Sequence, residues 1–126
     1  MSDKLSAAET SVVIVVSEFN QPIIENLLHG ALKAFSHHGG KESEISIYRV
    51  PGAFEIPGTI QQIMKFHNPH AIVALGAVIK GETAHFDYIA GESARGIAEI
   101  SINANIPVIN GILTTDTARQ AEERSQ

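Results

Sequence analysis

The chain has 126 residues, of which 44% are hydrophobic and 18% are charged, and this composition predicts one globular domain with a sizeable core. Its formal net charge of −5, with no basic cluster, argues against a nucleic-acid partner. The sequence contains no cysteine, which excludes disulfides and thiolate metal sites and fits a cytoplasmic protein, and its longest apolar run of about nine residues is too short to cross a membrane.

Apolar runs and helical repeats alternate along the chain after residues 1–10, which are polar and are expected to form a flexible segment. Short β-branched or alternating runs predict strands, and apolar residues three and four apart predict helices. The first half predicts, in chain order, a strand Val12–Val16, a helix opened by Asn20 and Pro22 and ended by Gly39-Gly40, a strand Ile45–Val50 and a helix Ile56–Met64. The second half predicts a strand Ala71–Ile79, a helix Phe86–Ala104, a strand Pro107–Leu113 and a short helix that is capped by Asp116 and ends near Arg124.

This alternation predicts an α/β domain over residues 11–126, with a four-stranded parallel sheet covered by helices on both faces. In such a three-layer α/β/α sandwich, the loops that follow the strands gather along one edge of the sheet, where ligands commonly bind. These loops are Glu18–Gln21, Pro51–Glu55, Lys80–His85 and Thr114–Asp116. We therefore expect the functional site among them.

The loop after the third predicted strand carries the strongest chemical signal. It leads into a helix start, whose free N–H groups and positive dipole end suit an anion. Lys80 adds positive charge, Thr83 a hydroxyl, and His85 a group that exchanges protons near neutral pH. This loop thus combines an anion cradle with an acid/base group. The remaining histidines are expected on or beside helix surfaces, in contact with solvent; they are His29, His37, His38, His67 and His70.

Three further residues allow two interpretations each. Phe19 could stack on a flat heterocycle or cover the core. Glu55 could bind sugar hydroxyls or be a solvated acid at a helix N-terminus, and Arg124 could grip a phosphate or complement the last turn of a helix. No Gly-rich phosphate loop follows the first strand and no Gly-x-Ser-x-Gly elbow is present, which argues against a nucleotide phosphate there and against a serine hydrolase.

Several segments resemble the 6,7-dimethyl-8-ribityllumazine synthase family, in matching order and spacing. They are Phe19-Asn20, Val50–Pro57, Leu75–Tyr88 and Gly111–Asp116. The resemblance implies a flavodoxin-like fold and a transferase of riboflavin biosynthesis. The implied reaction condenses 5-amino-6-(D-ribitylamino)uracil with 3,4-dihydroxy-2-butanone 4-phosphate, releases phosphate and water, and needs no metal or organic cofactor.

The same resemblance implies roles for individual residues. His85 would be the catalytic residue, moving protons during Schiff-base formation and phosphate elimination. Phe19 would stack on the pyrimidine ring. The rest of the pyrimidine and ribityl site would be Asn20, Ala53, Phe54, Glu55, Val78, Ile79, Lys80 and Asn110. The phosphate would be held by Gly81, Glu82, Thr83 and, from a neighbouring subunit, Arg124.

Assembly is also part of the resemblance. Family members form homopentamers, some of which build icosahedral shells, with each active site shared between neighbouring subunits and riboflavin synthase as a candidate partner. Asn110 stands in an expected Asn-Gly turn, where many members carry an aromatic residue that packs over the neighbour's substrate. Members also continue beyond the position of Arg124 with a basic loop and a long helix that residues 11–126 lack.

Two other functions stay open at this level. A non-catalytic flavin- or ribityl-binding assembly protein would keep the fold and lose the chemistry, and His85 together with the phosphate loop argues against it. A pentameric riboflavin synthase would dismutate lumazine alone. The requirement for the butanone phosphate as a second substrate separates a lumazine synthase from that enzyme.

Overall fold

Strands and helices alternate along the chain as the sequence predicts, in a computed structural model that describes residues 10–82 and 85–126. The strands are β1 (Val12–Ser17), β2 (Ile45–Val50), β3 (Ala71–Ile79) and β4 (Val108–Thr115). The helices are α1 (Gln21–His37), α2 (Ile56–Phe66), α3 (Phe86–Asn103) and α4 (Ala118–Ser125), with short 3-10 turns η1 (Glu42–Glu44) and η2 (Ala53–Glu55). All four strands pair in parallel, in the order β2-β1-β3-β4.

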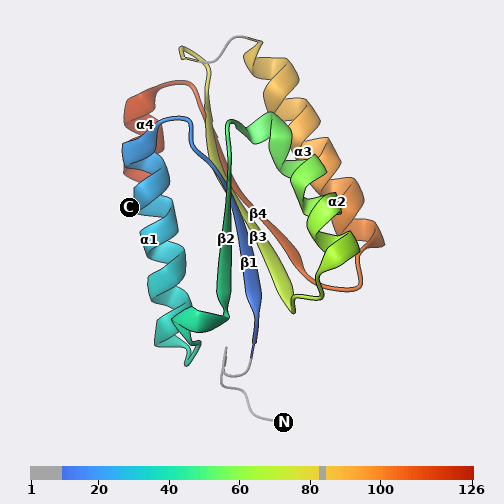
Figure 1. Cartoon of the computed structure of the whole chain (residues 1–126). Coiled ribbons are helices and arrows are strands. Elements are labelled where there is room, and N and C mark those ends of the chain that lie inside the picture. The colour runs from blue at the N-terminus through green and yellow to red at the C-terminus, as the bar shows by residue number, and fades with distance from the viewer. Residues whose placement is uncertain (1–9, 83–84) are drawn as a thin grey trace.

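Helices cover both faces of this sheet, which confirms the predicted three-layer arrangement. Helices α1 and α4 pack on one face, and α2 and α3 pack on the other (Figure 1). Successive side chains of β1 alternate between the two faces. Val13 and Val15 therefore join the apolar cluster with α2 and α3, whereas Ile14 and Val16 join the cluster with α1. Burial on both sides explains why β1 is a continuous β-branched run.

Strand β4 is longer than predicted. The predicted strand ends at Leu113, but the ladder with β3 continues to Thr115, which pairs with Ile79. Threonine is β-branched and fits a pleated sheet. Thr114 and Thr115 therefore continue the pairing with β3, which extends as far as Ile79. This extension brings the end of β4 level with the end of β3.

The expected Asn-Gly turn is wrong. Asn110 and Gly111 both lie inside β4, where they pair with Ala74 and Leu75 of β3. An Asn-Gly pair marks a hairpin turn only between antiparallel strands, and this sheet has none. The glycine instead permits close packing, because a Cβ on Gly111 would lie 2.9 Å from Leu75 Cδ2. The Asn110 side chain accepts the Ile112 N–H at 2.9 Å along the strand.

The cap of the last helix is also corrected. Asp116 was expected at the N-cap of α4, but Thr117 occupies that position and its hydroxyl accepts the Gln120 N–H at 3.2 Å. The Gln120 side chain reaches back and accepts the Asp116 N–H at 3.0 Å. The sequence has the Thr-x-x-Gln pattern of a capping box, although the Gln120 side chain bonds the N–H of the residue before the N-cap, so the sequence contained the correct signal for the Thr117 cap.

Some predictions fall outside the part of the chain that the structure describes. They concern residues 1–9 of the expected flexible segment and Thr83 of the phosphate loop. Among the described helices, none has the length and apolar character needed to cross a membrane.

Candidate functional site

A cavity of about 540 Å³ opens at the carboxyl edge of the sheet, beside the start of α3. It is lined by Phe19, Pro51, Gly52, Ala53, Phe54, Glu55, Ala77, Val78, Glu82, His85, Tyr88 and Ile89. These residues come from the loops after β1, β2 and β3, from the carboxyl end of β3 itself and from the first turn of α3. The cavity has the size and the mainly apolar wall of a small-molecule site, with a few polar groups at its rim.

The loop after β1 gives the cavity an exposed aromatic ring. The Glu18 N–H donates to Val50 O at 2.8 Å, which holds this loop against the end of β2. Phe19 keeps 39% of its surface exposed while it lines the cavity. The alternative in which Phe19 covers the core therefore does not hold, and its ring is available for stacking on a flat ligand.

The loop after β2 forms a second wall. Ala53 is buried at the base of η2, whereas Phe54 and Glu55 are exposed towards the cavity. The ring of Phe54 stacks on that of Tyr88, with centroids 5.8 Å apart and planes 27° from parallel. Sequence reasoning did not single out Tyr88 as a site residue. Its position one helical turn after His85 is the signal that could have found it.

His85 lies at the junction of the phosphate loop and α3. It occupies the N-cap position of α3, and its exposed side chain lines the cavity. Within the described residues, Asn20 and His85 are the non-glycine residues with positive φ, at 66° and 56°. Such backbone conformations cost free energy in non-glycine residues and concentrate at functional sites. Both strained residues lie in loops at this edge of the sheet.

Asn20 and Glu82 connect the loops of two neighbouring strands. Asn20 is half-buried and follows Phe19, and its Nδ2 donates to Glu82 Oε2 at 3.1 Å. Each residue was predicted as a ligand contact. Their mutual hydrogen bond was not predicted, because it joins side chains 62 positions apart in the sequence.

Two backbone N–H groups in the loop after β3 already donate hydrogen bonds within the protein. The Lys80 N–H donates to Thr115 O at 3.0 Å, and the Glu82 N–H donates to Ile79 O at 3.1 Å. Ile79 itself is fully buried on the face covered by α1. Ile79, Lys80 and Gly81 are missing from the described lining of the cavity. A ligand that used the Lys80 or Glu82 N–H would have to displace these bonds.

Asn110 and Arg124 do not meet the other predicted site residues within the chain. Asn110 lies inside β4, roughly 16 Å from the carboxyl end of that strand by the usual rise per residue. Arg124 is exposed on α4, which packs against α1 on the face of the sheet opposite α3 (Figure 1). Neither residue is among those that line the cavity in the described structure.

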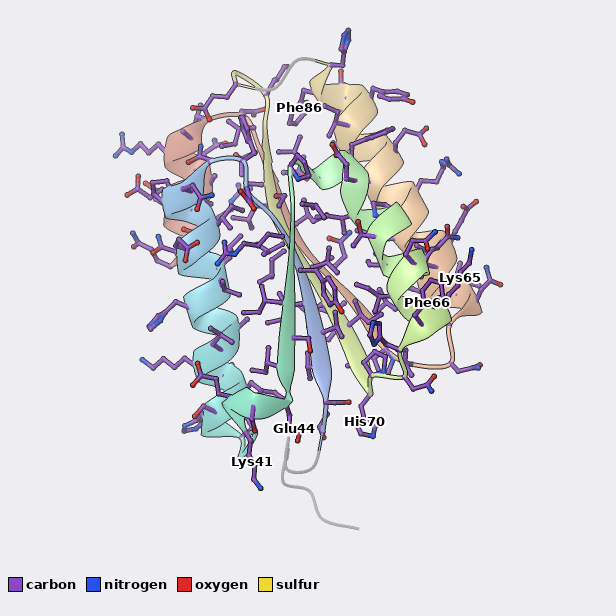
Figure 2. All side chains as sticks on the ribbon, viewed as in Figure 1. Lys41, Glu44, Lys65, Phe66, His70 and Phe86 are labelled. Carbon is purple, nitrogen blue, oxygen red and sulfur yellow. The ribbon has the colours of Figure 1, made fainter. Side chains whose placement is uncertain are left out.

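The remaining histidines are exposed, as predicted, at His29, His37, His38, His67 and His70. His70 lies at the opposite end of the sheet from Phe86, the residue that follows His85 (Figure 2). Its Nδ1 accepts the Ser11 N–H at 2.9 Å and so fastens the start of β1. Within residues 10–82 and 85–126, no cluster of three or more His, Asp or Glu side chains is arranged to hold a metal ion.

Comparison with known proteins gives a consistent result. A family profile described as 6,7-dimethyl-8-ribityllumazine synthase matches residues 9–126. The 6,7-dimethyl-8-ribityllumazine synthases of Campylobacter jejuni subsp. jejuni serotype O:23/36 (strain 81-176) and of Campylobacter jejuni (strain RM1221) are each 47% identical over 118 residues, covering 94% of this chain and 77% of theirs. That of Campylobacter jejuni subsp. doylei (strain ATCC BAA-1458 / RM4099 / 269.97) is 46% identical with the same coverage. The chain therefore belongs to the 6,7-dimethyl-8-ribityllumazine synthase family.

Proposed function

We propose that the cavity at the carboxyl edge is where this family member condenses 5-amino-6-(D-ribitylamino)uracil with 3,4-dihydroxy-2-butanone 4-phosphate. The products are 6,7-dimethyl-8-ribityllumazine, phosphate and water, in the penultimate step of riboflavin biosynthesis. The observation that carries the proposal is that Phe19, Glu55 and His85, from three separate loops, line one cavity of about 540 Å³. Family membership supports the same reaction.

The pyrimidine substrate would lie against Phe19. Offset stacking on an exposed ring is favourable and would hold the reacting amine in a fixed plane. Val78 and the Ala53-Phe54 backbone line the same cavity and would contact the ring and its side chain. Glu55 and Asn20 offer oxygen acceptors that suit the hydroxyl donors of a ribityl chain. Backbone groups of Val78, Ile79 and Lys80 would contact the polar edge of the pyrimidine.

His85 would move the protons of the reaction. An imidazole beside the cavity can accept a proton as the amine nitrogen bonds to the carbonyl carbon, and can return it to the departing oxygen. The same group can assist when the C–O bond to phosphate breaks. Holding both substrates together would supply much of the rate, since it replaces a bimolecular encounter by a local one.

The phosphate would be held by two subunits. Gly81, Glu82 and Thr83 precede the start of α3, where backbone N–H groups and the helix dipole favour an anion. Arg124 of the same chain lies on the opposite face of the sheet, so a neighbouring subunit would supply the guanidinium. Asn110, inside an edge strand, would likewise face a neighbour's substrate.

This arrangement calls for a ring of subunits. We propose a homopentamer in the cytoplasm, which could build further into an icosahedral shell. Each cavity would be completed by the next subunit in the ring, as in other head-to-tail assemblies. Riboflavin synthase would use the product and is therefore the proposed protein partner.

Incubation of the purified protein with both substrates tests the function. The expected result is the appearance of lumazine absorbance with release of one phosphate for each lumazine formed. Consumption of lumazine alone, without need for the butanone phosphate, would instead identify a dismutase. Binding of a ribitylated pyrimidine with no turnover would identify a non-catalytic binding protein.

A further inference from the structure

Asn20 turns its side chain away from the helix that it begins. Asparagine is among the best N-cap residues because its side-chain oxygen usually accepts an N–H from the first helical turn. Here the Asn20 carbonyl accepts the Ile24 N–H at 3.1 Å, but its side chain makes no capping bond to the described first turn of α1. Its Nδ2 donates to Glu82 Oε2 instead. The Asn20 side chain therefore does not cap α1, and it joins the loop after β1 to the loop after β3 instead.

Both partners of this contact lie in hydrogen-bonded backbone segments. Asn20 is held in the left-handed region, at φ 66 and ψ 70, as the N-cap of α1. Glu82 ends a turn that its own N–H closes onto Ile79 O at 3.1 Å. The preceding Lys80 N–H ties the same loop to Thr115 O of β4 at 3.0 Å. The two side chains therefore meet between anchored segments.

The contact determines which way the Asn20 amide points. A carboxylate only accepts hydrogen bonds, so the NH₂ group of Asn20 must face Glu82. The Oδ1 atom is then directed away from Glu82, and within the described residues no group donates to it. Asn20 itself is not among the described residues that line the cavity, but both its neighbour Phe19 and its partner Glu82 are. An asparagine without this constraint could rotate its amide and offer either a donor or an acceptor.

We propose that Glu82 is a positioning residue for the ribityl-bearing substrate. Its carboxylate orients the Asn20 amide so that Oδ1 accepts a hydrogen bond from a substrate hydroxyl. This inference rests on the proposed function, and it assigns the Glu82 side chain to the pyrimidine half of the site. A carboxylate aimed at the phosphate would instead repel that ligand, because like charges at close range disfavour each other.

Steady-state kinetics of two Glu82 variants test the proposal. Glu82→Ala should raise KM for the aminopyrimidine by about threefold to tenfold, as expected when one neutral hydrogen bond from a substrate hydroxyl to Asn20 Oδ1 is lost, and should leave KM for the butanone phosphate unchanged. Glu82→Gln should raise the same KM by less than Glu82→Ala, because a glutamine amide can accept from Asn20 Nδ2 but can also donate to Asn20 Oδ1, so it no longer fixes the direction of the Asn20 amide. Glu44→Ala removes the same charge at the opposite end of the sheet (Figure 2) and should alter neither KM.

A double-mutant cycle tests the coupling directly. If Glu82 acts through Asn20, then Glu82→Ala should add little to the effect of Asn20→Ala on KM for the aminopyrimidine. Additive effects of the two substitutions would overturn the proposal. A change confined to KM for the butanone phosphate, in either Glu82 variant, would also overturn it and assign the side chain to the phosphate. Thermal melting of each variant shows whether it is folded.

Ligand binding separates this inference from the proposed function. The dissociation constant of a ribitylated pyrimidine is measured without the second substrate, so it does not depend on turnover. A wild-type protein that binds this ligand but forms no lumazine would contradict the proposed reaction alone. An unchanged dissociation constant in folded Glu82→Ala, with an active wild-type protein, would contradict the positioning role alone.

Discussion

His85 is the residue whose chemistry the proposed reaction uses most directly, because its ring lines the cavity from the N-cap of α3. We expect His85→Ala to lower kcat by roughly tenfold to a hundredfold, at the weaker end of acid/base effects. His29→Ala, which removes an exposed histidine from α1, should leave kcat unchanged. The measurement is kcat between pH 5 and 9, spanning the usual imidazole range. An unchanged rate at every pH would show that water or substrate groups carry the protons.

Arg124 is the residue whose proposed role depends on a neighbour. We expect Arg124→Ala to raise KM for the butanone phosphate by roughly tenfold, since it removes a charged hydrogen-bond donor to phosphate. Arg119→Ala is a matched control on the same helix, because Arg119 is exposed and pairs with Glu123 at 3.4 Å. If only KM for the aminopyrimidine rose in Arg124→Ala, the phosphate assignment would be wrong.

The location of a site residue could be predicted from the sequence where it depends only on the loop that carries the residue. Phe19, Glu55 and His85 each follow a strand of the sheet, and parallel strands bring their carboxyl ends to one edge. The stacking of Tyr88 on Phe54 and the orientation of the Asn20 amide were not predictable. Both depend on how loops from different strands face each other, which no local pattern in the sequence encodes.

At the scale of elements, the N-cap of α4 gives a direct test of local stability. Thr117→Ala removes the hydroxyl that accepts the Gln120 N–H, and it should destabilise the fold by about 1 kcal/mol. For a chain of this size, that corresponds to a fall in Tm of about 4 °C. Thr117→Ser keeps the hydroxyl and should melt close to wild type. Equal losses in both variants would mean that the threonine methyl group, not the cap, is responsible.

Element interiors were predicted better than element ends. β3 matches its predicted bounds because Ala71–Ile79 is a continuous apolar run that only a doubly covered strand can bury. The end of β4 and the start of α4 were misplaced by one or two residues. Pairing with β3 decides where β4 ends, and hydrogen bonds to the Gln120 side chain help to decide where α4 begins. Neither can be read from the spacing of apolar residues.

At the scale of the whole molecule, a shared site predicts complementation between inactive variants. Glu55→Ala and Arg124→Ala subunits, coexpressed in equal amounts, should form some sites in which both residues are intact. Random mixing in a head-to-tail ring gives about a quarter of such sites. The measurement is lumazine formation by the mixed rings, with each variant alone as the baseline.

A second mixture controls this experiment. Glu55→Ala and Phe19→Ala affect residues that line the same cavity of one chain, so their mixed rings should regain no activity. Both pairs must be shown to coassemble, for example by separately tagged subunits. Mixed Glu55→Ala and Arg124→Ala rings that stay inactive would exclude a site shared through Arg124.

The strand order β2-β1-β3-β4 has a consequence for how the protein is made. β1 is synthesised early, but one of its two partners is β3, whose paired residues lie about 60 positions further along the chain, so this contact is non-local. At ordinary translation speeds, β3 leaves the ribosome roughly 3–12 s after β1. During that interval the β-branched run of β1 has one edge without its final partner, and an apolar strand edge of this kind exposes the nascent chain to mispairing and aggregation.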